Sequence, residues 1–167
     1  MNRKSWWATN AFASQTHNSI VKYTLDAYGK KIQEDYDSNA DGSSNSITKY
    51  IRNLGSRSLI QIQYDTDANG IVDAITLFTG TLNIDSATFN TSELTSIRMS
   101  GSPLISISAT KLNEIGHELR IRGSEDNKIT LKGAFMAAAD EGNYKVYSSP
   151  NGTKIKIQNG VTISLEP

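Results

Sequence analysis

Two consecutive stretches of the chain share one pattern: DYDSNADGSSNSITKY at residues 35–50 and QYDTDANGIVDAITLF at residues 63–78. Aligned on Gly42 and Gly70, both read D-x-[DN]-x-[DN]-G-x-x-[DN], and they begin at Asp37 and Asp65. Oxygen-bearing side chains at positions one, three and five, with glycine at six, form the first half of an EF-hand-type calcium loop. The two stretches therefore predict a pair of metal-binding loops.

Each loop has five positions that can supply an oxygen. Side chains serve at positions one, three, five and nine, and a main-chain carbonyl serves at position seven. The predicted Ca²⁺ ligands are Asp37, Asn39, Asp41, Ser43 and Asn45 in the first loop and Asp65, Asp67, Asn69, Ile71 and Asp73 in the second. The second loop has three carboxylates and the first has two, so the second is expected to bind Ca²⁺ more tightly. Mg²⁺ fits less well, because it prefers fewer protein ligands and strict octahedral geometry.

The closing ligand of an EF-hand is missing from both loops. Position twelve is Thr48 in one loop and Thr76 in the other, where a bidentate glutamate is expected. The missing ligand has to come from elsewhere, and Asp35 or Asp26 is a candidate for the first loop. A solvated turn rich in Asn, Asp and Gly is the alternative interpretation. Two such loops in register favour calcium.

The repeat extends beyond the loops. Tyr23 corresponds to Tyr50 and Ile47 to Ile75, with a period of about 27 residues, which indicates a repeated supersecondary unit. Each unit reads as strand, tight turn, strand, acidic loop and strand, with turns at 26–29 and 53–56 where glycine would provide a positive φ. The alternating segments 58–64 and 74–78 favour strands over helices on both sides of the loops.

Composition excludes several classes of protein. The 167 residues include 17 acidic and 17 basic side chains, so the chain lacks the excess of positive charge that would attract nucleic acid or an anionic membrane. It contains no long apolar run, which argues against membrane insertion. Cysteine is absent, which excludes disulfides and thiolate zinc sites.

Residues 82–167 are predicted to form a second, small β-rich domain with one short helix. The helix is expected over 108–116, capped by Ser108 or Thr110 and ended by Gly116. Segment 135–140 is either another helical turn or an Ala-rich loop. The last three strands, YKVYS, KIKIQ and VTISL, are joined by NG turns and predict an antiparallel meander. The expected core residues are Leu112, Ile115, Leu119, Ile121, Ile129, Leu131, Val146, Ile155, Ile157, Val161 and Ile163.

Other residues are possible sites. His117 in GHEL lacks the H-E-x-x-H pattern and reads as a helix-end histidine. Glu114 and Glu118 flank it, but no surrounding pattern supports a paired-carboxylate glycosidase. Trp6 and Trp7 are expected to pack against the first sheet, or alternatively to stack on a sugar. No catalytic motif is present in the sequence.

The second half resembles the domain near the C-terminus of very large bacterial adhesins exported by type I secretion. The resemblance lies in LISIS, ATKLNEIG, LRIRGSED, KITL, KGAF, YKVYS and NGTKIKI, with Phe135 where that family has tryptophan. The acidic loops are similar to Asp-rich tandem segments of the same RTX-type, Bap-like surface adhesins, and to thrombospondin type 3 repeats and dockerins. The resemblance implies an extracellular or cell-surface location, neighbouring domains in a longer chain, and stiffening by external calcium.

These observations predict a mainly β protein, with antiparallel strand repeats and calcium loops preceding the small β-rich domain. Its parts are an N-terminal segment (1–19), a two-repeat calcium-binding region (20–81) and the second domain (82–167). The expected function is non-enzymatic: a calcium-binding structural module of a secreted or surface-attached adhesin. The alternatives are a carbohydrate- or protein-binding module, with exposed tyrosines or Trp6 and Trp7 on a host or surface glycan or protein, and an accessory domain of a secreted hydrolase.

Overall fold

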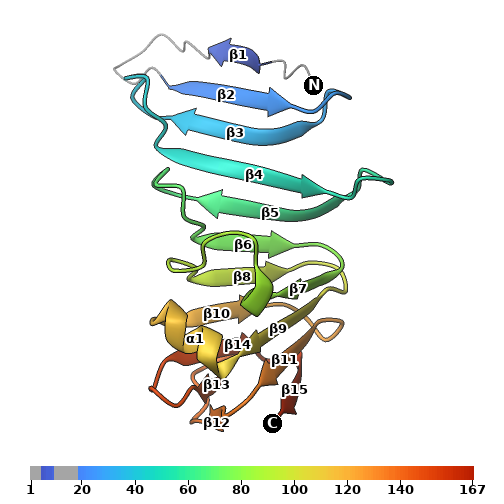
Figure 1. The fold of residues 1–167 in the computed structure, drawn as a ribbon, viewed down its shortest axis with the longest axis vertical. Helices are drawn as coiled ribbons and strands as arrows, with labels where there is room; N and C mark the ends of the chain where they lie inside the picture. Colours follow the sequence, from blue (N-terminus) through green and yellow to red (C-terminus); the bar gives the residue numbers. More distant parts are fainter. Residues whose placement is uncertain (1–4, 10–18) are drawn as a thin grey trace.

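The structure, a computed structural model, describes residues 5–9 and 19–167, with side chains from residue 19 onward. It is mostly β-strand with one short helix, so the predicted fold class is confirmed (Figure 1). Two sheets are present. Sheet A has the order β1-β2-β3-β4-β5-β6-β8-β10-β14-β13-β12, and sheet B has the order β15-β11-β9-β7.

The element bounds are these: β1 Ser5–Thr9, β2 Ile20–Leu25, β3 Lys31–Asp37, β4 Ser46–Arg52, β5 Leu59–Asp65, β6 Ala74–Leu77, β7 Thr81–Asn83, η1 Ile84–Ser86, β8 Ser96–Met99, β9 Leu104–Ser108, α1 Ala109–Ile115, β10 Leu119–Arg122, β11 Lys128–Lys132, β12 Met136–Ala137, β13 Tyr144–Ser148, β14 Lys154–Gln158 and β15 Thr162–Glu166.

Strands β1 to β6 form an antiparallel meander, in which the hairpins β2–β3 and β4–β5 are the two predicted repeats. Both hairpins contain a register shift next to the turn, between Thr24 and Leu25 and between Ile51 and Arg52. The first turn has a positive φ at Gly29, as expected. The second does not use its glycine in this way: the positive φ falls on Arg57, and the Asn53 side chain accepts hydrogen bonds from Gly55 and Ser56.

Strands β2 to β4 form a single layer, because sheet B lies over the other end of sheet A (Figure 1). Most side chains there are only half-buried. Cross-strand clusters supply part of the stabilisation that a core would provide. Lys31 Nζ lies 4.2 Å from the centre of the Tyr23 ring and 2.6 Å from Glu34 Oε2. Tyr50 donates its hydroxyl proton to the same carboxylate at 3.2 Å.

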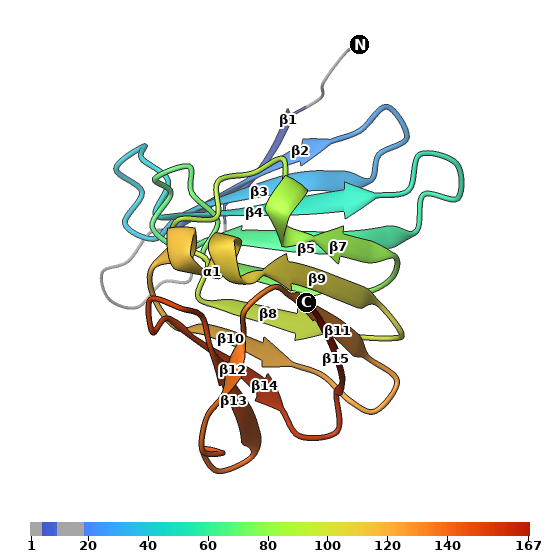
Figure 2. The ribbon, with the colours of Figure 1, turned by 60° about the horizontal axis from the view of Figure 1, so that its bottom comes forward.

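From β6 onward the chain winds into four coils, each with one strand in sheet A followed by one in sheet B. Coils 1 to 4 are β6–β7, β8–β9, β10–β11 and β14–β15, and together they are called the coil stack. Within each sheet the coil strands run parallel: Ala74 pairs with Ser96, Ser96 with Arg120, and Arg120 with Lys156. Figure 2, viewed toward the C-terminal end, shows the two layers.

The core lies between the two sheets of the coil stack. Alternation places one set of apolar side chains inward on every coil strand. The buried cluster is formed by Val72, Ile75, Leu77, Leu82, Ile84, Leu94, Ile97, Met99, Ile105, Ile107, Leu112, Ile115, Leu119, Ile121, Ile129, Leu131, Ile155, Ile157 and Val161. Of the eleven core residues predicted from the sequence, nine are in this cluster; Val146 is also buried, and Ile163 packs against the cluster from its edge.

The predicted C-terminal meander is wrong in its last step. Strands β13 and β14 are antiparallel as expected, but β15 crosses to sheet B and pairs in parallel with β11. An NG turn closes a hairpin only if the next strand returns alongside the previous one, and here β15 pairs with β11 instead, where Ile163 lies beside Ile129 and packs against the core. Segment 135–140 is not helical, since β12 pairs with β13 there.

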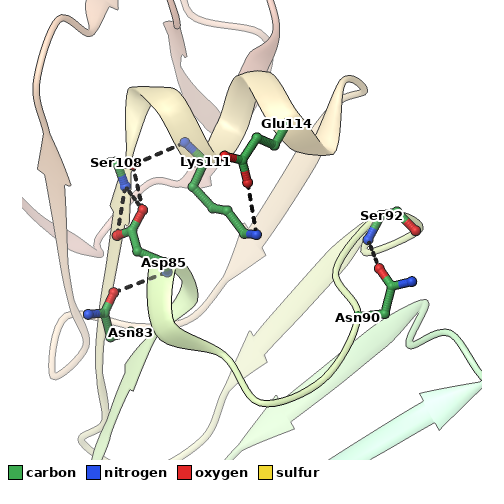
Figure 3. A network of polar contacts seen from close by, with 7 residues as sticks. All are labelled: Asn83, Asp85, Asn90, Ser92, Ser108, Lys111 and Glu114. Carbon is green, nitrogen blue, oxygen red and sulfur yellow. Dashed lines mark hydrogen bonds and ion pairs between the residues drawn. The ribbon is translucent and has the colours of Figure 1, made fainter.

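Helix α1 begins and ends as predicted. Ser108 accepts a hydrogen bond from the Lys111 N–H, and Gly116 ends the helix with φ of 75°. The Asp85 carboxylate of η1 accepts hydrogen bonds from the Ser108 N–H and hydroxyl (Figure 3). This contact fixes the segment between coils 1 and 2 to the start of α1. Within α1, Leu112 is fully buried.

The boundary predicted near Thr81 falls inside coil 1, at the first residue of β7. Sheet A continues across it without a break, and Val72, Ile75 and Leu77 from before the boundary belong to the core. Whether residues 20–81 and 82–167 unfold separately depends on their local stabilities, so the division into two domains stays a prediction.

Candidate metal centre

The two acidic loops lie on the same side of sheet A. They follow β3 and β5, which run in the same direction because both are antiparallel to β4. The loops therefore lie on the same side of sheet A, at the ends of β3 and β5 (Figure 1).

The two loops share one backbone conformation. At position four, Ala40 and Ala68 have φ of 56° and 57°, and at position six, Gly42 and Gly70 have φ of 96° and 91°. A positive φ is strained for alanine and unstrained for glycine. The sharp turn predicted at position six is thus present in both.

The leading aspartate of each loop is buried and held from within the loop. Asp37 and Asp65 are 2% and 5% exposed. The N–H of Gly42 donates to Asp37 Oδ2 at 2.9 Å, and the N–H of Gly70 donates to Asp65 Oδ2 at 2.8 Å. Buried carboxylates require such partners, and these bonds draw each loop around its first position.

The ninth position closes each loop from the other side. Asn45 Oδ1 accepts from both the N–H and the hydroxyl of Ser38, and Asp73 Oδ2 accepts from the same two groups of Thr66. The matching contacts confirm the alignment of the two loops, although the residue changes from an amide to a carboxylate.

Three carboxylates of the second loop converge. Oxygen atoms of Asp65, Asp67 and Asp73 lie within 4.8 Å of one another, so this group could hold a metal ion. The donors are oxygens only, as hard cations such as Ca²⁺ and Mg²⁺ prefer. At position seven, the N–H of Ile71 donates to Asn69 Oδ1 at 2.7 Å, and Ser43 makes the equivalent bond to Asp41 in the first loop.

The first loop has fewer charges. Asp37 and Asp41 are its carboxylates, and Asn39 donates from its amide to Asp41 Oδ2 at 2.9 Å. The hydrogen bond from the Ser43 N–H, together with the one from Asn39, lowers the pKa of Asp41 below its usual value.

The ligand missing at position twelve is not supplied by Asp26. Its carboxylate accepts hydrogen bonds from the N–H groups of Tyr28 and Lys30, in the turn at the far end of β3 from the loop. Asp35 accepts from Gln33 Nε2 at 2.7 Å, so its carboxylate also has a structural partner.

An acidic residue that sequence reasoning missed lies at the second loop. Glu93 comes from the segment between η1 and β8, and its Oε2 accepts a hydrogen bond from Asn69 Nδ2 at 2.8 Å. Asn69 also donates to Asp67, so its amide connects the two carboxylates. Nothing in the local sequence TSEL marks Glu93, because only the winding of coil 1 into coil 2 brings it to the loop.

The residues near α1 have structural partners. His117 Nε2 is 3.2 Å from the Leu94 carbonyl oxygen, and Glu114 is paired with Lys111. Burial raises the pKa of Glu118, but hydrogen bonds from Lys156 and Arg120 outweigh it and lower the pKa overall. The side chains of Trp6 and Trp7 lie outside the described residues. Within the described ranges, no helix has the length and apolar character needed to cross a membrane.

Comparison with known proteins gave no match: no protein family, no curated protein and no solved structure was found to be similar to this chain.

Proposed function

We propose that the chain is a calcium-binding structural module, in which Ca²⁺ occupies the two acidic loops and stiffens the single-layer part of sheet A. The observation that carries the proposal is the convergence of Asp65, Asp67 and Asp73 in a loop whose backbone conformation is repeated in the first loop. Two copies of one loop in one conformation are unexpected for solvated turns, which are free to diverge.

The chemistry favours Ca²⁺ over Mg²⁺. Each loop offers several oxygens from one short segment, and Ca²⁺ accepts six to eight oxygen ligands in flexible geometry. Glu93 adds a carboxylate beside the second loop. Asn45 and Asn39 replace carboxylates in the first loop, so it is proposed to bind more weakly.

Linkage is the proposed mechanism. A ligand that binds the folded loops and not the unfolded chain stabilises the fold by mass action. The single layer gains most, because β2 to β4 have little core of their own. In a large secreted or surface-attached adhesin, which the sequence resemblance suggests, low internal calcium would leave this region loose for export and high external calcium would stiffen it.

The experiment is calorimetric titration of metal-free protein with CaCl₂, and with MgCl₂ as a comparison. We expect two Ca²⁺ sites of different affinity and weaker or no binding of Mg²⁺. The variants Asp65→Asn and Asp37→Asn each remove the charge of one proposed ligand, and each should abolish one of the two sites. Absence of Ca²⁺ binding up to millimolar concentration would overturn the proposal.

A second candidate function has one supporting observation. The two hairpin turns opposite the loops form a pocket of about 300 Å³, which is lined by Tyr28, Ile32 and Leu54 together with polar and charged side chains that include Arg52 and Arg57. Tyr28 is 66% exposed and Leu54 fully exposed, and the Arg57 guanidinium stacks 3.3 Å from the centre of the Tyr28 ring. This arrangement would suit a carbohydrate- or protein-binding module. A glycan array or pull-down signal lost in Tyr28→Ala would support it.

A further inference from the structure

Two arginines lie side by side on the outer face of the coil stack. Arg98 of β8 and Arg122 of β10 are opposite each other in the parallel register. Their neighbours Ile97, Met99 and Ile121 are buried in the core, so alternation places both arginines on the outer face of sheet A, where they are exposed. Figure 1 shows the two strands next to each other, with their carboxyl ends on the same side. Like charges at opposed positions of neighbouring strands destabilise a sheet.

Neither arginine is neutralised by a described part of the chain. No ion pair among the side chains of residues 19–167 includes Arg98 or Arg122, and residues 1–18 contain no Asp or Glu. The adjacent basic pair is different, because Arg120 of β10 and Lys156 of β14 both form ion pairs with Glu118, at 2.9 and 2.6 Å. One basic pair on this face is thus balanced by a carboxylate, and the other is not.

A pocket of about 390 Å³ is lined by both unbalanced arginines. It lies at the carboxyl ends of β8 and β10, and Ser100, Ser124 and Gln158 supply further polar side chains to its lining, which includes no Asp or Glu. Its volume falls in the range of about 300–1,000 Å³ that is usual for small-molecule sites. The pocket therefore has the size for a small ligand and a positive charge.

The polar side chains of the lining are mainly hydrogen-bond donors. Each guanidinium has five N–H donors and no acceptor. Gln158 Oε1 accepts from the Gly123 N–H at 3.2 Å, so its amide NH₂ is the part that is left to donate to a ligand. The hydroxyl of Ser100 can donate as well. Two positive charges beside such donors match negatively charged oxygens, because guanidinium groups bind carboxylate and phosphate oxygens in bidentate pairs.

The two corners that carry the arginines are held together by Asn127. This side chain is fully buried, donates to the Gly101 carbonyl at 2.7 Å and accepts from the Ser124 N–H at 2.7 Å. It therefore connects the corner after β8 to the corner after β10. A side chain at Gly123 would collide with Asn127, which keeps the second corner closely packed. The walls of the pocket are thus fixed before a ligand binds, which lowers the cost of ordering them.

We propose that this pocket binds an oxyanion group, namely the sulfate, phosphate or carboxylate of a small ligand, between the guanidinium groups of Arg98 and Arg122. The site is separate from the candidate metal centre. Strands β8 and β10 are parallel to β6, which is antiparallel to β5, so their carboxyl ends lie on the opposite side of sheet A from the acidic loops. Binding of the anion therefore does not depend on Ca²⁺, and Asp65→Asn should leave it unchanged.

The first test is titration of the metal-free full chain, followed by the NMR signals of its backbone amides. The probes are sodium sulfate, glucose 6-sulfate, glucose 6-phosphate and glucuronate, with glucose as the uncharged comparison. We expect the anions, and not glucose, to shift the signals of residues 98–101 and 122–124. Tighter binding of a sugar-linked group than of inorganic sulfate would identify an anionic sugar as the ligand, and equal binding would identify the free anion; either result supports the site.

The second test removes one positive charge at a time. Arg98→Gln and Arg122→Gln should each weaken binding of the tightest probe by about tenfold or more, because only one guanidinium then contacts the oxyanion. Arg120→Gln is the matched control. It changes the net charge equally and lies two positions from Arg122, but its guanidinium is already paired with Glu118, so it should bind the probe as the unchanged protein does. High concentrations of NaCl should weaken binding, since the site is open to solvent.

Thermal melting separates binding from folding. Without an anion, Arg98→Gln should melt no lower than the unchanged protein, because it removes a repulsion. With sulfate, the unchanged protein and Arg120→Gln should gain more stability than Arg98→Gln or Arg122→Gln, because only an intact site adds binding to the fold. Sulfate also stabilises proteins generally by its exclusion from their surface, so equal gains in all four proteins would overturn the proposal. Absence of signal shifts at residues 98–101 and 122–124 up to millimolar probe would overturn it as well.

Discussion

Asn69 donates its side-chain amide to the Glu93 carboxylate at 2.8 Å, although the two residues are 24 positions apart. The contact joins the second acidic loop to the segment that leads from coil 1 into coil 2. It therefore connects the candidate metal centre between β5 and β6 to the coil stack, whose core includes the neighbouring Leu94.

Calcium should stabilise the fold. At a free concentration of one hundred times Kd, each site contributes about 2.7 kcal/mol, so we expect the melting temperature to rise by several degrees in millimolar CaCl₂. The measurement is a thermal melt followed by circular dichroism in CaCl₂ and in chelator. Identical melts would contradict the expectation.

The second loop should be the tighter site. Asp65→Asn or Asp67→Asn should weaken total Ca²⁺ binding more than Asp37→Asn, because the second loop has one more carboxylate. The asparagine variants keep the size of the side chain, and at Asp65 and Asp37 they keep an acceptor for the N–H of Gly70 and Gly42. Calorimetry that assigns the higher affinity to the first loop would reverse the ranking and indicate an additional ligand such as Asp35.

Glu93 should add to the affinity of the second loop alone. Glu93→Gln removes a charge beside Asn69 and is expected to weaken Ca²⁺ binding there by about tenfold, or about 1.4 kcal/mol. The first loop should be unaffected. Glu114→Gln, which removes a carboxylate from the exposed side of α1, is the matched control and should change neither site.

Calcium removal should loosen the single layer and not the coil stack. Strands β2 to β4 lack a covering sheet, whereas coils 1 to 4 share the buried cluster. Hydrogen exchange in chelator should rise over residues 20–65 and stay low over β8, β10 and β14. An equal rise in hydrogen exchange along the whole chain would show that it unfolds as one cooperative unit. If the faster exchange extended as far as Thr81 instead of ending before β6, the boundary expected from the sequence would be correct.

Stability should fall in acid partly through Lys156. Its Nζ lies 2.6 Å from Glu118 and 2.6 Å from Glu141. Hydrogen bonds from Lys156 and Lys154 lower the pKa of Glu141, and those from Lys156 and Arg120 lower the pKa of Glu118 despite its burial.

Because both folded-state pKa values are depressed, this stabilisation is present above the unfolded value of 4.5 and is lost as pH falls through the folded values. Between about pH 5 and pH 3, the range that brackets the usual pKa of a carboxylate, the variant Lys156→Met should therefore lose less stability than the unchanged protein. Parallel curves of melting temperature against pH for the two proteins would contradict this.

The sequence by itself determined the local features of this protein. Spacing alone identified the two acidic loops and their shared register, because ligand positions and the glycine at six are set by residues a few positions apart. The same holds for α1, whose cap at Ser108 and end at Gly116 are local hydrogen-bond and φ requirements. Alternation of apolar residues also indicated strands correctly.

Only the tertiary structure decided how the strands are paired. Strand, glycine turn and strand recur at 74–84, 96–107, 119–131 and 154–165, but alternation is satisfied equally by antiparallel hairpins and by parallel coils. The coils form because parallel neighbours such as Ile97 and Ile121 bury one common set of side chains between two sheets. That winding brings Glu93 to Asn69 and places Arg122 beside Arg98, since both depend on contacts between residues far apart in the sequence.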